Sequence, residues 1–151
     1  MLRVLPIALA VAAIAVSGCG SDVKARNDYV DAVNKAQNGF ATSFARLSRR
    51  ITSTSTPAQD QRTLNGFKRA VDRAVTQLRA IEVPDGVKGQ HAQLVNEIAA
   101  YGREIDKAKK AFRSSSPQDV IKAQTQLVSA VTRVSAQINH TIDQINKKLR
   151  E

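Results

Sequence analysis

The stretch VKGQHAQLVNEIAAYGREIDKAKKAF, residues 87–112, carries the clearest architectural signal in the chain. Its apolar positions and one histidine recur at alternating steps of four and three: Val87, His91, Leu94, Ile98, Tyr101, Ile105, Ala108 and Phe112. This spacing places all of them on one face of a helix. A stripe sustained over more than three heptads is typical of a helix that packs against other helices. The segment therefore predicts a long helix inside a helical bundle.

Three further segments carry a stripe of the same kind. The stripe of 22–51 contains Val33, Ala36, Phe40, Phe44, Leu47 and Ile51; that of 57–81 contains Leu64, Phe67, Val71, Ala74, Leu78 and Ile81; that of 117–151 contains Val120, Leu127, Val131, Val134, Ile138, Ile142, Ile145 and Leu149. Gln124 is the one polar interruption of the last stripe. Four long helices are therefore predicted.

The breaks between these segments are short and carry helix-start signals. They read TSTST at 52–56, EVPDG at 82–86 and SSS at 114–116. Thr56 is followed by Pro57 and Gln59, and Ser116 is followed by Pro117, which are the residues of an N-cap and a first helical turn. Because short loops leave neighbouring helices antiparallel, the sequence predicts an all-α protein, an up-down-up-down antiparallel four-helix bundle.

The N-terminus reads MLRVLPIALAVAAIAVSGCGS over residues 1–21. Arg3 precedes an apolar run from Val4 to Val16. A membrane-spanning helix needs roughly 20 apolar residues, so this run is too short to span. A positive residue, a short apolar run and small residues are typical of a cleaved signal peptide.

The end of that segment, Val16-Ser17-Gly18-Cys19, resembles the lipobox of bacterial lipoproteins. The resemblance implies that a signal peptidase recognises Val16, Ser17 and Gly18 and removes residues 1–18. It also implies that a diacylglycerol is attached to the sulfur of Cys19, the only cysteine. The alternative is an ordinary secretory signal cut near Ser17 or Gly18, which would leave an unpaired exported thiol. The expected mature protein is therefore a lipid-anchored bundle domain, residues 19–151, on the extracytoplasmic face of the cell membrane.

The predicted topology brings basic residues to the anchored end of the bundle. These are Lys24, Arg26, Lys88, Lys147, Lys148 and Arg150. Basic side chains that reach anionic headgroups contribute roughly 1 kcal/mol each, so this end is expected to contact the membrane. A second basic set is expected to point outward at the opposite end: Arg46, Arg49, Arg50, Lys109, Lys110 and Arg113. The alternative is that both sets are solvated helix faces and favourable last-turn cations.

Two residues are candidates for a ligand site between the helices, His91 and Tyr101. The alternative for His91 is a hydrogen-bonded residue at the core boundary near Tyr29, and the alternative for Tyr101 and Gln124 is a polar core residue that fixes helix register. Glu-x-x-His and Gly-x-Ser-x-Gly patterns do not occur, and the only methionine is Met1. No catalytic residue, metal site or cofactor is predicted apart from the covalent diacylglycerol, and the protein is not expected to be an enzyme.

The chain is strongly basic, with 23 Lys and Arg against 13 Asp and Glu and a net charge of +10. Such a charge suits a phosphate-binding surface. Predicted export and the scarcity of aromatic residues, two Tyr and four Phe, argue against a nucleic-acid partner. The expected partners are the membrane itself, anionic envelope polymers or another envelope protein.

Beyond the lipobox the chain is similar to small helical lipoproteins of actinobacteria. The similarity rests on the helical repeat, on the Ile81-Glu82-Val83-Pro84 turn that leads into the helix with His91, and on an Ala-, Val- and Arg-rich composition. It implies anchoring to the outer face of the cytoplasmic membrane, and it supplies no catalytic residues to carry over. The first hypothesis is a non-enzymatic interaction or structural module of the envelope. The second is a binding protein for a small or amphipathic ligand between the helices.

Overall fold

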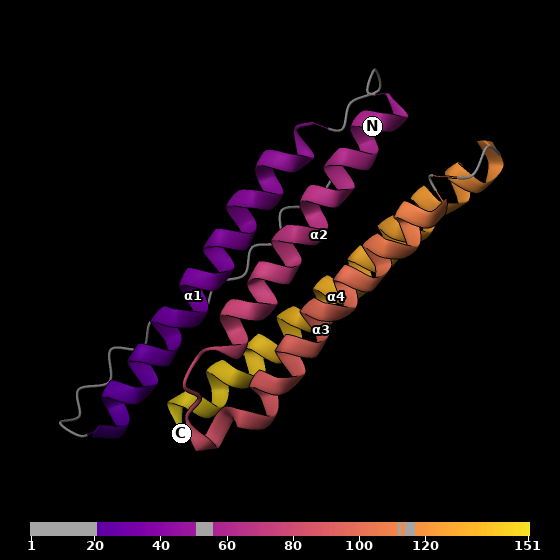
Figure 1. The fold of residues 1–151 in the computed structure, drawn as a ribbon. Helices are drawn as coiled ribbons and strands as arrows, with labels where there is room; N and C mark the ends of the chain where they lie inside the picture. The colour runs from indigo at the N-terminus through magenta and orange to yellow at the C-terminus, as the bar shows by residue number, and fades with distance from the viewer. Residues whose placement is uncertain (1–20, 51–55, 112, 114–116) are drawn as a thin grey trace.

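The computed structural model describes residues 21–50, 56–111, 113 and 117–151. Over these ranges the chain forms α-helices, one short 3-10 turn and no strand: α1 (Ser21–Ser48), α2 (Pro57–Arg79), η1 (Asp85–Val87), α3 (Lys88–Ala111) and α4 (Pro117–Arg150). Figure 1 shows that α1 and α3 run away from the end that holds the C-terminus, whereas α2 and α4 run back toward it. The predicted all-α, up-down-up-down antiparallel four-helix bundle is confirmed.

The start of α2 follows the predicted capping chemistry. The hydroxyl of Thr56 accepts a hydrogen bond from the Gln59 N–H at 3.3 Å, and the Gln59 side chain accepts one from the Thr56 N–H at 2.7 Å. This capping box satisfies two backbone donors, and Pro57 occupies the first turn, where its missing N–H costs nothing. The helix begins where the local sequence places it.

Other boundaries differ from the sequence prediction by one to three residues. The helix predicted to reach Ile81 ends at Arg79. Val87 closes the 3-10 turn, in which its N–H donates to Pro84 O at 3.1 Å, so α3 begins one residue later. The first helix ends at Ser48, because the Arg50 N–H donates to Leu47 O at 2.9 Å and forms a turn.

Several predicted features lie outside the described residues. They are the signal peptide with Val16, Ser17, Gly18 and Cys19, the helix residues Ile51 and Phe112, the Ser116 cap, and the side chain of Gln124. Among the helices that the structure does describe, none combines the length and apolar character that crossing a membrane would take.

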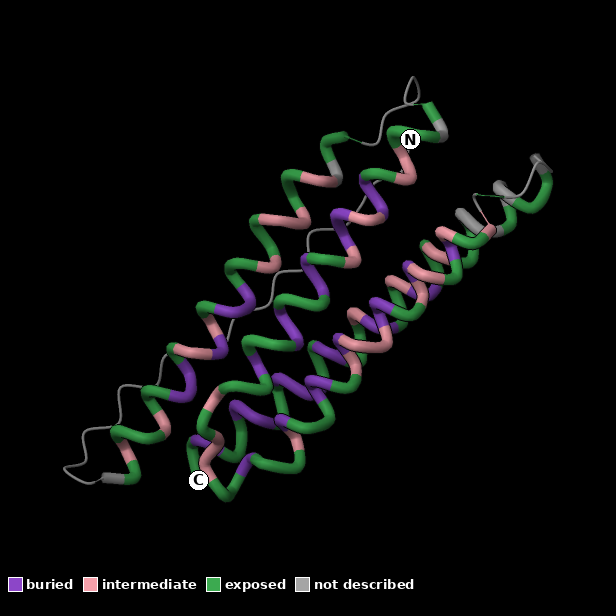
Figure 2. The backbone as a smooth tube through the Cα atoms, in the orientation of Figure 1, coloured by how far each residue is buried: buried purple, intermediate pink, exposed green. Residues whose placement is uncertain are grey.

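The core extends along the whole of α2 and α3 but along only part of the other two helices. In α1 the buried side chains stop at Gln37, and in the described part of α4 they begin at Ala130. In Figure 2 the buried positions face the interior and concentrate toward the end that holds the C-terminus. Consecutive helices make the main packing contacts, whereas α1 and α4 contact each other less than consecutive helices do.

Two glycines allow α2 to approach its neighbours closely. A Cβ at Gly66 would lie 2.7 Å from a methyl carbon of Leu47 on α1, and a Cβ at Gly102 would lie 3.2 Å from a methyl carbon of Val71. Helix separation depends on the side chains at the contact, so a missing Cβ shortens it. At these two positions the α1–α2 and α2–α3 interfaces leave little or no room for a Cβ.

Candidate functional site

One end of the bundle, here called the basal end, brings together three distant segments. They are the start of α1, the connection between α2 and α3, and the end of α4 (Figure 1). A hollow of about 990 Å³ lies between them, lined by apolar and by charged side chains. Arg26 of α1 bridges to α4, because its Nη1 donates to Leu149 O at 2.8 Å. The structure thus brings the start of α1 next to the C-terminal turn.

The six cations predicted to contact headgroups all belong to the basal end, but two of them are held by carboxylates. Lys24 pairs with Asp28, and Lys88 pairs with Asp85 at 2.6 Å. The hydrogen bond and charge of Lys88 lower the pKa of the Asp85 carboxyl, and Asp85 in turn raises the pKa of Lys88. The pKa of Lys24 is raised by Asp28 in the same way.

Acidic residues balance the basic residues over the whole basal end. The segments 21–29, 80–88 and 143–151 contain six basic and six acidic side chains. The acidic ones are Asp22, Asp28, Glu82, Asp85, Asp143 and Glu151. Spacings of three and four residues between Asp85 and Lys88 and between Lys24 and Asp28 would have indicated the two ion pairs from sequence alone. The basal end is therefore nearly neutral in side-chain charge.

His91 is buried with both ring nitrogens engaged. Its Nε2 lies 3.0 Å from Leu78 O, and its Nδ1 lies 3.1 Å from the Tyr29 hydroxyl. A carbonyl oxygen only accepts, so Nε2 carries the hydrogen, and Nδ1 accepts a hydrogen bond from Tyr29. Burial lowers the pKa of His91, while the bond to Leu78 partly opposes that shift. The neutral imidazole therefore joins α1, α2 and α3, and the contact with Tyr29 offered as the alternative to ligand binding is present.

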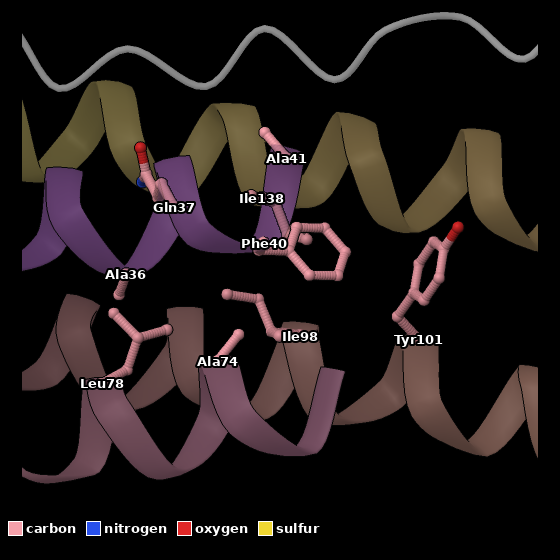
Figure 3. Close-up of a pocket in the computed structure, with 9 residues that line it drawn as sticks. All are labelled: Ala36, Gln37, Phe40, Ala41, Ala74, Leu78, Ile98, Tyr101 and Ile138. Carbon is pink, nitrogen blue, oxygen red and sulfur yellow. The ribbon is translucent and has the colours of Figure 1, made fainter. Parts of the chain in front are cut away.

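Tyr101 lines a cavity that His91 does not reach. The cavity measures about 30 Å³ and lies between all four helices (Figure 3). It is lined by Ala36, Gln37, Phe40, Ala41, Ala74, Leu78, Ile98, Tyr101 and Ile138. Organic ligands occupy sites of roughly 300–1,000 Å³, whereas a space of this size holds about one water molecule. The structure does not bring His91 and Tyr101 into one pocket of ligand size.

The side chain of Tyr101 is part of an aromatic cluster. Its ring packs edge-on against Phe40 at 6.3 Å and against Phe44 at 6.1 Å between centroids, and Phe44 also contacts Phe67 at 4.7 Å. Edge-to-face pairs stabilise a core beyond the area they bury. Burial raises the pKa of Tyr101, so its phenol stays protonated at neutral pH. These contacts give Tyr101 a packing role.

A second polar residue at this cavity is Gln37, which the apolar stripe of residues 22–51 did not predict to be buried. Its side chain is 6% exposed, and neither its amide nitrogen nor its amide oxygen has a hydrogen-bond partner among the described residues. Gln37 follows Val33 by four residues, which places it at the edge of the α1 stripe. This spacing could have predicted its burial from sequence. An unpaired buried amide costs free energy, so Gln37 destabilises the bundle locally.

Replacing this amide by an apolar side chain of similar size should stabilise the protein. Gln37→Leu removes two unpaired polar atoms beside an apolar cavity, and we expect the free energy of unfolding to rise by about 1 kcal/mol. Urea unfolding followed by circular dichroism measures the change. Gln77→Leu, at an exposed position of α2, is the matched control and should change the stability by less than about 0.5 kcal/mol. A loss of stability in Gln37→Leu would mean that the amide has partners in solution.

A second polar contact connects α3 and α4. The buried hydroxyl of Thr141 donates to Glu97 Oε1 at 3.0 Å, and the Gln93 amide donates to the same oxygen at 2.9 Å. The other carboxylate oxygen of Glu97 has no partner in the described part of the chain. The described residues contain no group of three or more His, Cys, Asp or Glu that would hold a metal ion. Glu97 therefore orients α4 on α3 through one hydrogen bond.

The fold and these contacts define a class of protein, an antiparallel four-helix bundle in which the buried His91 and Thr141 join one helix to another. No family model, curated protein or solved structure matches the chain.

Proposed function

We propose that the protein is a lipid-anchored lipoprotein of the cell envelope, and that its bundle is a non-enzymatic interaction or structural module. The observation that carries the proposal is that α1 already includes Ser21, so that in the sequence only Gly20 separates it from the lipobox cysteine, Cys19. An acylated Cys19 would hold the basal end against the membrane, and the bundle would extend outward by about 40 Å at 1.5 Å per residue.

The last turn of α4 supplies the cations best placed for headgroups. Lys147, Lys148 and Arg150 are exposed, and none of them forms a salt bridge within the described ranges. Each would add roughly 1 kcal/mol on an anionic surface. Two acyl chains are enough for stable anchoring, so these cations orient the bundle more than they retain it.

The geometry argues against a ligand site shared by His91 and Tyr101. The 30 Å³ cavity beside Tyr101 is far below the size of a ligand site, and His91, which lines a separate hollow of about 310 Å³, uses both ring nitrogens within the protein. The exposed helix faces supply the larger surface for partners. The resemblance to actinobacterial lipoproteins supports the outer face of the cytoplasmic membrane as the site of anchoring.

The anchor is tested by removing the sulfur. The protein is expressed in a bacterium with its native signal, and wild type is compared with Cys19→Ala by mass spectrometry and membrane fractionation. We expect wild type to begin at a diacylglyceryl Cys19 in the membrane fraction, and the variant to lose both the lipid mass and the membrane association. Ser17→Ala keeps a small residue in the lipobox and should be processed like wild type. An unmodified, soluble wild-type chain would refute the proposal.

A further inference from the structure

The arginines of this bundle differ from its lysines in their partners. Each salt bridge among the described residues is formed by a lysine, with Lys68 and Lys109 sharing Asp106 as one example. No arginine takes part in a salt bridge in these ranges, and Arg26 bonds to a backbone carbonyl instead. The carboxylates of the described bundle therefore leave the guanidinium groups unneutralised.

Six of these arginines belong to one hairpin, α1 with α2. We call them the arginine face: Arg46, Arg49, Arg50, Arg62, Arg69 and Arg73. All six are exposed. They occupy the last turn of α1, the turn that follows it, and the first three quarters of α2. The arginine face therefore begins at the end of the hairpin remote from Cys19 and extends past the middle of α2.

Helix geometry places the two halves of the arginine face next to each other. Arg62, Arg69 and Arg73 are spaced by seven and four residues, so they share one stripe on α2. Gly66 belongs to the same stripe, and the Leu47 side chain covers it at a distance of 2.7 Å from an added Cβ. The end of α1 therefore lies against this stripe, with its own arginines within one turn of the contact.

The arginine face lacks the carboxylates that balance the basal end. The segments 46–50 and 62–73 contain a single acidic residue, Asp72, and Lys68 donates to both of its oxygens at 2.5 and 2.7 Å. Six like charges gathered on one hairpin repel each other, and a bound polyanion would relieve that repulsion. Guanidinium groups bind phosphate and carboxylate through two parallel hydrogen bonds. A ligand that carries several anionic groups in a row would therefore neutralise the guanidinium groups of this surface.

We propose that the arginine face binds a linear polyanion of the cell envelope, a polymer whose repeating units carry phosphate or carboxylate groups. From Arg62 to Arg73 the stripe extends about 16 Å along α2, enough for several repeating units. The inference rests on the proposed anchoring for where the polymer is met, because an anchor at Cys19 turns the α1–α2 connection, where the arginine face begins, away from the membrane. Binding itself requires only the exposed guanidinium groups.

The test uses the full wild-type chain purified in a nonionic detergent, with polyphosphate and polygalacturonate as probes. We expect calorimetry to detect binding of at least one polymer, weakened by added salt because the charges are solvent-exposed. The triple substitution R62Q/R69Q/R73Q should weaken binding at least tenfold. The control R103Q/K122Q/R133Q removes the same charge from exposed positions of α3 and α4 and should change the affinity less than twofold. If the first variant fails to fold, R46Q/R49Q/R50Q on the other half should show the same loss.

Three results would overturn the inference. They are the absence of binding to both polymers, equal weakening by the two triple substitutions, and tighter binding of the arginine face to phosphatidylglycerol vesicles than to either polymer. Equal weakening would mean that only net charge matters. The outcomes are separable from failure of the anchor, because every variant keeps Cys19. A wild-type chain that binds polymer but carries no lipid would refute the anchoring proposal alone.

Discussion

Leu94→Ala should lower the free energy of unfolding by about 3 kcal/mol, since burial of a leucine is lost and a cavity remains. Leu94 is 0% exposed and lies on the α3 stripe that packs into the core. A typical domain has only about 5–15 kcal/mol of stability, so this change removes a large share of it. Urea unfolding monitored by far-UV circular dichroism, whose native signal should be predominantly helical, measures the loss.

The control for this prediction is an apolar residue outside the core. Val128 on α4 is 43% exposed, and Val128→Ala should change the free energy of unfolding by less than about 0.5 kcal/mol. Equal effects of Leu94→Ala and Val128→Ala would contradict the packing described for α3. They would mean that Leu94 faces solvent, where truncation of its side chain creates no cavity.

His91→Ala should be comparably destabilising, by about 3 kcal/mol near pH 7.5, because it leaves a cavity and a buried hydroxyl without a partner. That hydroxyl belongs to Tyr29, which is 1% exposed, whereas the Leu78 carbonyl loses the bond from His91 but still accepts one from the Ile81 N–H at 3.1 Å. Tyr29→Phe removes the hydroxyl and one hydrogen bond only, so it should cost less, about 1 kcal/mol. His140→Ala removes an exposed histidine of α4 and should change the stability by less than about 0.5 kcal/mol.

The effect of His91→Ala should also depend on pH. Burial lowers the pKa of His91 in the folded protein below the ordinary value of 6.5, so on acidification the unfolded chain binds its proton first. The stability contributed by the neutral imidazole is therefore complete above pH 6.5 and declines as the pH falls below it. His91→Ala has no such loss, so its destabilisation relative to wild type should be smaller at pH 5 than at pH 7.5. A larger destabilisation at pH 5 would mean that the folded protein prefers the imidazolium.

Much of the bundle follows from local chemistry. The heptad spacing of residues 87–112 depends only on helical periodicity, and the cap of α2 depends on Thr56 and Gln59, three residues apart. The boundaries near residues 80–88 were less predictable, because Val87 closes a 3-10 turn on Pro84, and such a turn competes with α-helix over very few residues. The apolar periodicity and the short loops therefore predicted the number and direction of the helices, but they did not predict the exact residues at which the helices end.

The candidate sites were predicted less completely than the helices. Topology correctly gathers the six cations at the basal end, yet Asp28 and Asp85 neutralise two of them through side-chain contacts. Periodicity places His91 and Tyr101 on one stripe, but they belong to different surroundings because they are ten residues, or nearly three turns, apart along α3. An apolar stripe predicts which face of a helix is buried, but it does not predict which cavity each residue on that face lines.

Residue order alone specifies which segments are helices and how they are connected, because periodicity, capping and short loops act between residues that are neighbours along the chain. Packing between helices decides the rest. It joins His91 to Tyr29 across 62 positions, leaves the Gln37 amide without a partner, and sets the end of α1 against the arginines of α2 at Gly66. These contacts depend on how far one helix slides and rotates on another, and that is determined by the fit of side chains from separate segments.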